Sequence, residues 1–295
     1  MKIAAHILAY DVNRFIGPVI ENLEKQVDKI YIAYSELPWG YNIEARSSKK
    51  NPTRLSTIHT LMRNRGCAIE IIEGNWETEQ SMRNECLERA RQEGFDWFIA
   101  QDADEFYTEN SWSQIKKILS TDKTTYHFIT TMYNFWKSPK YILEDEYGNI
   151  KELASLAIRC NSNIYFTHAR SCNSINSVII DCPCYHYGYV KTNAEMQEKI
   201  STWAHANEFF LNSKTWYQVK WEHWDLRTSN LHPVSPSSWK RAIFFPLEQP
   251  EFAHQFEIYN EIILEKSRMI FLKTFFYDLK WRIYVFLRGI KRNLL

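Results

Sequence analysis

The sequence predicts an α/β fold, in which a mixed sheet is flanked by helices and followed by a C-terminal helical extension. Three observations support this prediction. Strand-like and helix-like patterns alternate at the start of the chain, strand-like patterns predominate later, and the final segment is apolar and basic. With 295 residues and 45% hydrophobic content, the chain is large enough to bury a substantial core.

The first part of the chain alternates between the two patterns. Strands are expected over 2–10, 29–35, 68–74 and 96–101, and helices over 14–27, 55–66 and 77–94, with a loop over 36–54. Because each crossover helix must pack back onto the sheet, this order predicts parallel strands covered on both faces. In such sheets, ligands bind at the carboxyl ends of the strands.

Strands predominate after residue 104. They are expected over 126–136, 152–160, 162–170 and 176–182, with a hairpin around 145–150. A helix is expected over 193–211, with Asn193 as its cap. This half of the chain is expected to extend the same sheet.

The charge is unevenly distributed. A formal net charge of +1 argues against a protein that binds nucleic acid or another polyanion as a whole. Residues 266–295 nevertheless carry eight Lys or Arg against the single acid Asp278. Lys266, Lys273 and Lys280 recur every seven residues, which places them on nearly one face of a helix. This composition favours a helix in the interface of an anionic membrane, with a helix packed on the domain as the alternative.

Six cysteines and the absence of a signal-peptide pattern predict a reduced, cytoplasmic protein. The sequence CPCYH offers Cys182, Cys184 and His186 to zinc. However, its spacing is not the usual C-x2-C, and a second pair of ligands does not stand out.

The stretch DWFIAQDADEF places Asp102, Asp104 and Glu105 directly after an apolar run. Alternate residues of an extended chain share a face, so Asp102 and Asp104 are expected on one side. A divalent cation between them would offset their repulsion and keep positions open for phosphate oxygens. The alternatives are a solvated acidic loop and a phosphatase D-x-D-x-[TV] motif, from which this chain departs because Phe106 occupies the last position.

The surroundings of this cluster resemble the donor-binding segment of family-2-like glycosyltransferases of the GT-A fold. In that family, a helix with an Arg-Asn pair leads to an apolar strand that ends in D-x-D or D-x-D-E. The corresponding residues here are Arg83, Asn84, Asp102, Asp104 and Glu105. Residues 6–35 resemble the family's opening strand and helix, although Ser35 and Glu36 replace its common DDGS. The segments YNFWKSPKY, CYHYGYVKT, MQEKISTWAHANE, WEHW and NLHPV are similar to segments of a bacterial branch.

The resemblance implies a GT-A domain over 1–235, with a nucleotide-binding half over 1–106 and an acceptor half over 107–235. A basic amphipathic helical extension follows over 236–295. The implied activity is transfer of a sugar, with inversion, from a nucleoside-diphosphate sugar to a glycan or lipid-linked acceptor. The enzyme would face the cytoplasm and associate peripherally with a membrane.

The resemblance also implies Mn²⁺ or Mg²⁺ as cofactor, with Asp102, Asp104 and His186 as metal-site residues. His168, His205 and His232 are lesser alternatives to His186. The expected donor-binding residues are Ala9, Tyr10, Asp11, Ser35, Trp39, Arg83, Asn84, Asp102, Ala103, Lys137 and Lys199. Trp136 is a further aromatic residue that offers a face to a base or sugar.

An inverting transfer needs a general base near the acceptor. The acids expected downstream of the D-x-D are Glu144, Asp145, Glu146, Glu152 and Asp181, and the sequence alone does not separate them. Two other classes of function stay open. A nucleotidyltransferase should carry a Gly-rich loop after its first strand, where this chain has only Gly17. A non-catalytic membrane-binding module leaves the acids unexplained.

Overall fold

The computed structural model describes residues 1–40, 43–202, 208–258 and 266–293 and divides the chain into two compact units. Unit 1 comprises Met1–Asn134, Lys151–Gly188 and Thr202–Ala204. Unit 2 comprises Phe135–Ile150, Tyr189–Ser201 and His205–Leu295. The boundary expected after residue 235 thus falls inside unit 2, and the division expected after residue 106 falls inside unit 1.

Unit 1 is an α/β unit, which confirms the predicted fold class. Its helices are α1 (Ile16–Leu23), α2 (Ile43–Ser48), α3 (Leu55–Leu61), α4 (Glu79–Gln92) and α5 (Glu109–Thr121). Its strands are β1 (Ile3–Ala9), β2 (Lys29–Tyr34), β3 (Ala68–Glu73), β4 (Trp97–Ala100), β5 (Glu105–Phe106), most of β6 (His127–Trp136), β8 (Glu152–Arg159) and most of β9 (Ser177–Tyr189). Every strand and helix expected before residue 101 is present.

The sheet of unit 1 has the order β6-β8-β4-β1-β2-β3, and β9 pairs with β5 and β6. Strand β1 is parallel to β2 and β4, whereas β8 is antiparallel to β4, so the sheet is mixed. The chain builds β1, β2 and β3 in one direction and then returns through α4 to place β4 on the other side of β1. Strand order therefore reverses between β1 and β4, and ligands of such sheets bind at this reversal.

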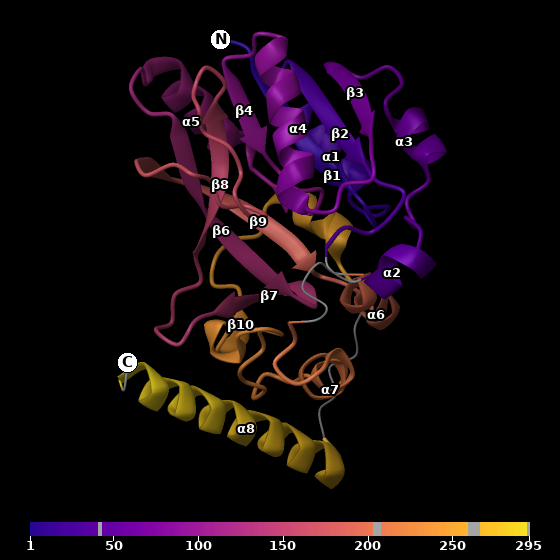
Figure 1. Cartoon of the computed structure of the whole chain (residues 1–295), viewed down its shortest axis with the longest axis vertical. Coiled ribbons are helices and arrows are strands. Elements are labelled where there is room, and N and C mark those ends of the chain that lie inside the picture. Colours follow the sequence, from indigo (N-terminus) through magenta and orange to yellow (C-terminus); the bar gives the residue numbers. More distant parts are fainter. Residues whose placement is uncertain (41–42, 203–207, 259–265, 294–295) are drawn as a thin grey trace. The chain divides into compact units, whose positions relative to one another are not determined.

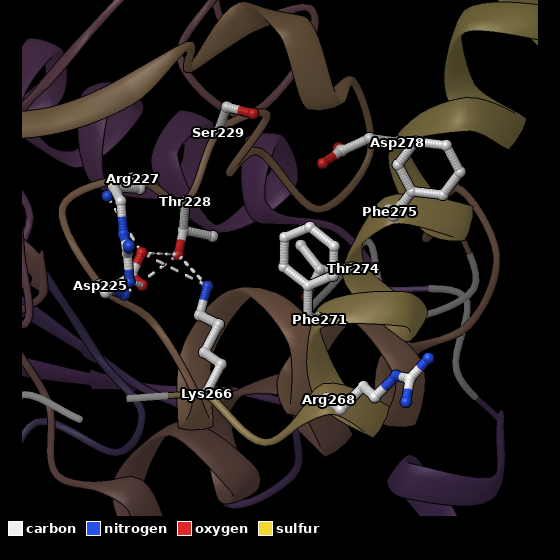
Figure 2. A pocket seen from close by; sticks show the side chains of 10 residues that line it. All are labelled: Asp225, Arg227, Thr228, Ser229, Lys266, Arg268, Phe271, Thr274, Phe275 and Asp278. Atoms are coloured by element: carbon white, nitrogen blue, oxygen red, sulfur yellow. Dashed lines mark hydrogen bonds and ion pairs between the residues drawn. The ribbon is translucent and has the colours of Figure 1, made fainter. Parts of the chain in front are cut away.

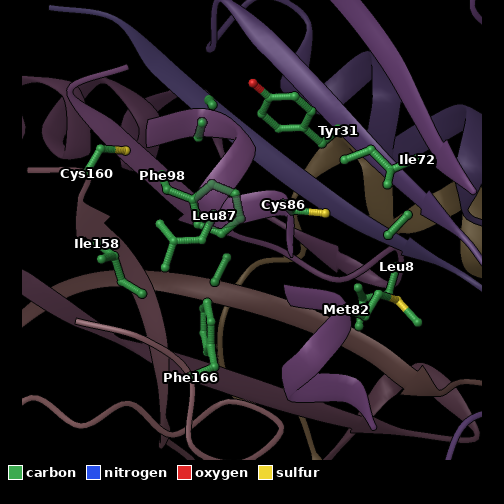
Figure 3. Packing of buried hydrophobic residues seen from close by; sticks show 14 residues of the cluster. Leu8, Tyr31, Ile72, Met82, Cys86, Leu87, Phe98, Ile158, Cys160 and Phe166 are labelled. Atoms are coloured by element: carbon green, nitrogen blue, oxygen red, sulfur yellow. The ribbon is translucent and has the colours of Figure 1, made fainter. Parts of the chain in front are cut away.

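Helix α4 covers one face of the sheet, where it contacts β1, β2 and β4 (Figure 1). Its Met82, Cys86 and Leu87 pack with Phe98 and Phe166 in an apolar cluster of unit 1 (Figure 3). The Thr78 side chain caps the start of the helix by accepting from the Ser81 N–H. This packing fixes the position of Arg83, which lies on the same buried side of α4.

The strand expected over 162–170 is not formed, because side chains satisfy its backbone. The Arg91 guanidinium donates to the carbonyl groups of Cys160, Ser162 and Ile164, at 3.0, 2.9 and 2.5 Å. The Asn84 amide pairs with both the N–H and the C=O of Phe166, at 2.8 and 2.9 Å. Residues 161–176 consequently form a loop, which holds only an isolated bridge between Phe166 and Cys172.

Four further expectations differ from the structure. Helix α2 lies within the expected loop 36–54, and α5 was not expected at all, although Trp112, Ile115 and Leu119 form a buried helical stripe. The expected hairpin around 145–150 contains a turn, but β7 (Ser138–Glu144) pairs with β6 and β10 (Arg241–Phe244). Strand β9 also continues past the expected residue 182 to Tyr189.

Unit 2 holds β7, β10 and mostly helical elements. These are α6 (Asn193–Thr202), α7 (Ser213–Trp216), a π-helix (Tyr217–Glu222), two 3₁₀-helices (Pro236–Ser238 and Glu251–Phe256) and α8 (Arg268–Asn293). Its core is aromatic: the Trp136 ring lies 4.9 Å from Trp221 and stacks on Tyr189 at 5.6 Å. The start of α6 is a capping box of Thr192 and Glu195, whereas the side chain of Asn193, the expected cap, accepts from Trp221.

Helix α8 is the predicted C-terminal helix. It begins at Arg268, so Lys266 precedes the helix. The prediction that Lys266 shares a helical face with Lys273 and Lys280 is therefore wrong. Within the part of the chain that the structure describes, none of the helices combines the length and the apolar character needed to cross a membrane.

Candidate functional site

The acidic stretch turns directly after β4. The Glu105 N–H donates to the Asp102 carbonyl at 3.1 Å, so residues 102–105 form a tight turn instead of an extended strand end. The strand alternation expected for Asp102 and Asp104 therefore does not apply. The turn gives the two carboxylates different partners.

Asp102 is held by two guanidinium groups. Arg83 Nη2 lies 2.8 Å from Asp102 Oδ1, and Arg170 Nη1 lies 3.2 Å from Oδ2. Arg83 is fully buried, and its remaining donors reach Glu79 and His6 Nε2. Arg170 also pairs with Glu105 and donates to the Ala100 and Ser155 carbonyl groups. Asp102 is thus the centre of a compensated, largely internal charge network.

The network fixes protonation states. Burial raises the pKa of Asp102, but the adjacent Arg83 and Arg170 lower it more, so the net pKa lies below its ordinary value. Burial, followed by the nearby Arg83 charge, holds the pKa of His6 well below its usual range. His6 is therefore neutral, and its Nε2 accepts from Arg83 Nη1 at 2.9 Å.

Asp104 faces His186. Glu105 on β5 is in register with His186 on β9, and this pairing brings His186 Nε2 to 3.6 Å from Asp104 Oδ1. His186 Nδ1 lies 2.5 Å from Asn134 Oδ1, which is an acceptor, so Nδ1 carries the proton. His186 Nε2, the other ring nitrogen, therefore faces the Asp104 carboxylate. Both side chains are about one-fifth exposed, at 21% for Asp104 and 19% for His186.

Gly188 provides the space for this pair. A Cβ atom at this position would overlap His186 Nε2 and would lie 2.9 Å from Asp104 Oδ2. Glu105 supports the turn from inside: it is buried, pairs with Arg170 and accepts the Asp102 N–H at 3.1 Å.

The ends of β1 and β2 are joined by a residue that the sequence reasoning missed. The Asn51 amide donates to the Ala9 and Ser35 carbonyl groups at 2.7 and 2.8 Å, and its oxygen accepts from the Asp11 N–H at 3.1 Å. Asp11 has a positive φ of 53°, which this contact supports. Asn51 lies in a loop distant in sequence, so strand patterns could not reveal it.

Tyr10 and Trp39 lie together beyond these strand ends. Their rings meet edge to face at 5.6 Å, and both are partly exposed. Trp136, by contrast, is buried in the aromatic core of unit 2 and offers no face to a ligand.

The other expected donor-binding residues of unit 1 are buried or hydrogen-bonded within the protein. Ala9 and Ala103 are buried. The Ser35 hydroxyl donates to the Leu37 carbonyl at 2.5 Å, and the Asn84 amide is occupied by the backbone of Phe166. Among this set, Arg83 and Asp102 are joined in one network.

Lys137 and Lys199 belong to unit 2, where each ammonium lies over an aromatic ring. Lys137 Nζ is 4.7 Å from the Trp221 ring centre, and Lys199 Nζ is 4.6 Å from that of Tyr189. Burial lowers the pKa of Lys137 to about 8.

The candidate bases are dispersed. Asp145 accepts from the Tyr147 and Asn149 N–H groups and closes the turn after β7, while Glu146 is exposed in the same turn. Glu144 pairs with Arg241. In unit 1, Asp181 pairs with Lys151 at 2.7 Å and accepts from Thr131 at 3.0 Å, and Glu152 is exposed at the start of β8.

The three histidines named as alternatives to His186 do not share its position. His232 Nδ1 accepts from the Val234 and Ser235 N–H groups, His168 lies in the loop 161–176, and His205 lies outside the described residues. Cys182 and Cys184 are buried. Across the described residues, no group of three or more His, Cys, Asp or Glu side chains is arranged to hold a metal ion.

Arg170, Asn134 and Gly188 were also missed as site residues. Arg170 lies in the stretch that was expected to be a strand, and Asn134 and Gly188 lie in the segments YNFWKSPKY and CYHYGYVKT but were not singled out there. The pairing of β9 with β5 and β6 and the path of the loop 161–176 bring them to the acidic turn.

Comparison with known proteins gives remote likenesses of fold. None of the family models matches the chain, and the search of curated proteins gives no match. Among solved structures, residues 1–349 of Staphylococcus aureus TarS match with 12% identity, a TM-score of 0.41 and coverage of 75% of each chain. The chain spans about half, 48%, of a longer TarS structure.

Two other solved structures are similar over about two thirds of this chain. The 4-diphosphocytidyl-2C-methyl-D-erythritol synthase from Anaerococcus prevotii has 11% identity and a TM-score of 0.38, with 66% of this chain and 93% of that chain covered. HddC from Yersinia pseudotuberculosis has 11% identity and a TM-score of 0.37, with coverage of 64% and 94%. At this level, the matches concern the general fold and do not distinguish one chemistry from another.

Proposed function

We propose that this chain is a metal-dependent glycosyltransferase that moves a sugar from a nucleoside-diphosphate sugar to a glycan or lipid-linked acceptor. The observation that carries the proposal is that the two aspartates of the acidic turn have different partners. Asp102 is paired with two guanidinium groups, and the Asp104 carboxylate faces His186 Nε2 across 3.6 Å. A carboxylate oxygen and a neutral imidazole nitrogen placed in this way can bind one cation together.

The donor set fits Mn²⁺ or Mg²⁺. A carboxylate oxygen and an imidazole nitrogen are ligands that Mn²⁺ accepts, and the hydrogen bond from Nδ1 to Asn134 is the kind of support that orients metal-binding histidines. Two protein ligands leave coordination positions for diphosphate oxygens and water. The metal would supply charge neutralisation of the leaving nucleoside diphosphate.

The protein residues would act as follows in this proposal. Arg83 and Arg170 keep Asp102 ionised, so its exposed edge can accept a hydrogen bond from a ribose hydroxyl. Tyr10 and Trp39 offer an aromatic surface beyond β1, next to the point where strand order reverses. The bond between the sugar and the diphosphate breaks, and the acceptor oxygen forms the new bond from the opposite side. A carboxylate takes the acceptor proton, with Asp145, Glu146, Glu152 and Asp181 as the candidates.

One structural feature disfavours a nucleotidyltransferase as the alternative. Such an enzyme needs a loop after its first strand whose backbone N–H groups face phosphates. Here the Asp11 N–H donates to Asn51 and the Val12 N–H donates to Thr53, at 3.1 and 2.8 Å. Those two donors are already engaged with protein side chains.

The test is to measure sugar transfer and donor hydrolysis by the full chain over a panel of UDP- and GDP-sugars, with Mn²⁺, Mg²⁺ or EDTA. We expect divalent-dependent turnover that Asp104→Ala abolishes and that Glu88→Gln, an exposed substitution on α4, leaves unchanged. Turnover of Asp104→Ala equal to the wild type would refute the metal role. Release of pyrophosphate from a nucleoside triphosphate and a sugar phosphate would instead identify a nucleotidyltransferase.

A further inference from the structure

Helix α8 carries large apolar side chains on its outward side as well as on its inward side. Ile270, Tyr277 and Trp281 form the side that packs on unit 2, and they are at most 8% exposed. The opposite side follows the spacing of one helical face and contains Arg268, Leu272, Phe275, Leu279, Arg282 and Phe286. Phe275 is 54% exposed and Phe286 is 68% exposed. A helix that only covered a domain would carry polar side chains on its outward side.

The exposed side is cationic as well as apolar. Between residues 268 and 288, the helix carries Arg268, Lys273, Lys280, Arg282 and Arg288. The only acid in this segment, Asp278, points into unit 2, where Lys220 and Asn230 donate to it at 2.7 and 2.9 Å. The outward face therefore has positive charge that no acid of the same helical segment offsets.

Both flanks of this face are hollowed and carry basic residues, and the larger hollow is also lined by Asp225 and Asp278. One hollow, of about 630 Å³, is lined by Arg227, Lys266 and Arg268, with Phe271 and Phe275 along the helix (Figure 2). Lys266 is anchored there by Asp225 and Thr228, while Arg227 and Arg268 remain exposed. The other hollow, of about 250 Å³, is lined by Lys273, Lys280 and Phe276, among others.

We infer that α8 lies in the interfacial region of an anionic bilayer. The apolar row enters the boundary of the acyl chains, and the basic flanks meet lipid phosphates. Aromatic and aliphatic residues between flanking Lys and Arg are the composition of an interfacial helix, and long basic side chains can extend toward the headgroups. Attraction to an anionic surface follows from the unbalanced positive charge.

The same charges disfavour a second copy of the chain as the partner. Arg268 and Arg282 belong to the outward row and are each seven residues from Phe275. Self-pairing through this row would bury arginines without an acid from the row to pair with them, which is costly. A bilayer surface instead supplies phosphates at the depth that arginine side chains reach.

The experiment is co-sedimentation of the full chain with phosphatidylcholine vesicles that contain or lack phosphatidylglycerol. We expect binding only to the anionic vesicles, with affinity that falls as salt is raised. Lys280→Gln with Arg282→Gln should weaken binding by about fivefold for each charge removed. Phe275→Ser with Leu279→Ser should reduce binding to the level seen with neutral vesicles.

Matched controls in unit 1 separate this site from general surface effects. Lys25→Gln with Lys117→Gln removes two exposed charges, and Ile175→Ser with Val178→Ser removes two exposed apolar side chains. Both controls should bind like the wild type, and thermal melts should show that every variant is folded. Equal binding of the α8 variants and the wild type would overturn the inference. So would a dimer that the α8 variants dissociate, combined with absence of vesicle binding. The result is independent of sugar transfer, so it stands or falls separately from the proposed activity.

Discussion

The acidic turn of unit 1 and helix α8 of unit 2 depart from the usual distribution of side chains in opposite ways. Unit 1 buries charge: Arg83 is fully buried, and Arg170 and Asp102 lie largely inside. Helix α8 exposes apolar surface, including Phe275 and Phe286. Buried charge is tolerated only when partners inside the fold compensate it, whereas exposed apolar surface points to a partner outside the fold. The first region should therefore control stability, and the second should control association.

The largest effect on stability is expected when Arg83 is removed. Arg83→Met leaves Asp102 and Glu79 without their shared partner, and we expect the free energy of unfolding to fall by about 3–5 kcal/mol. The control is Arg89→Met on the same helix. Arg89 is 45% exposed, and its ion pair with Glu70 is long, at 3.7 Å. That change should cost less than about 1 kcal/mol. Urea denaturation of both variants measures the difference, and similar losses would show that the buried network has no special importance.

Gly188→Ala tests the space around Asp104 and His186. The added Cβ forces one of the two side chains to move, so we expect a loss of about 1–3 kcal/mol in stability and loss of divalent-dependent nucleotide binding. Gly17→Ala is the control, because its Cβ would meet Leu61 at an ordinary 3.6 Å. Calorimetric titration with Mn²⁺ and UDP or GDP provides the measurement. Unchanged binding by Gly188→Ala would contradict the assigned geometry.

The buried His127 should make unit 1 sensitive to acid. Its ring contacts Ser177 and Ser155 at 2.7 and 2.8 Å, and burial lowers its pKa to about 4 from an ordinary value near 6.5. Between these values, the unfolded chain binds a proton that the folded chain does not. Stability must therefore fall as pH decreases through this range.

The expected loss from this residue between pH 7 and pH 5 is about 2 kcal/mol. His127→Asn should be less stable than the wild type at pH 7, but its stability should decline less on acidification. Denaturant titrations at the two pH values measure the difference in slope. Parallel losses in the two proteins would assign the acid sensitivity to other groups.

The smallest effect on stability is expected on the outward side of α8. Phe275→Ser should change the free energy of unfolding by less than about 0.5 kcal/mol, because the ring is already more than half exposed. Tyr277→Ser, two residues away on the inward side, should cost about 3 kcal/mol, because the ring is buried beside Phe210 and Lys220. Equal losses in thermal or urea unfolding would mean that Phe275 packs against the protein.

Local patterns predicted the first half of unit 1 because its strands and helices have clear periods. The same patterns gave a wrong prediction where side chains, and not a neighbouring strand, form hydrogen bonds with the backbone. Residues 162–170 alternate like a strand, yet Arg91 and Asn84 take their backbone groups. A local sequence pattern does not contain the position of a distant guanidinium or amide.

The candidate site shows the same limit. The acidic residues and His186 could be selected from sequence, because they follow a buried strand or stand in a distinctive segment. Their separate partners could not, since Arg170 and Asn134 reach them only through the loop 161–176 and the path of β6. Strand alternation had placed Asp102 and Asp104 on one side of an extended chain, but residues 102–105 form a turn, so this rule does not apply to them.

The most direct test of the central claim is Mn²⁺ binding in the presence of UDP or GDP, measured by calorimetric titration for the wild type, Asp104→Asn and Asp102→Asn. We predict that Asp104→Asn weakens Mn²⁺ binding by at least about tenfold. Asp102→Asn should retain binding of Mn²⁺ alone while nucleotide affinity falls. Wild-type Mn²⁺ affinity in Asp104→Asn, with the loss confined to Asp102→Asn, would contradict this account.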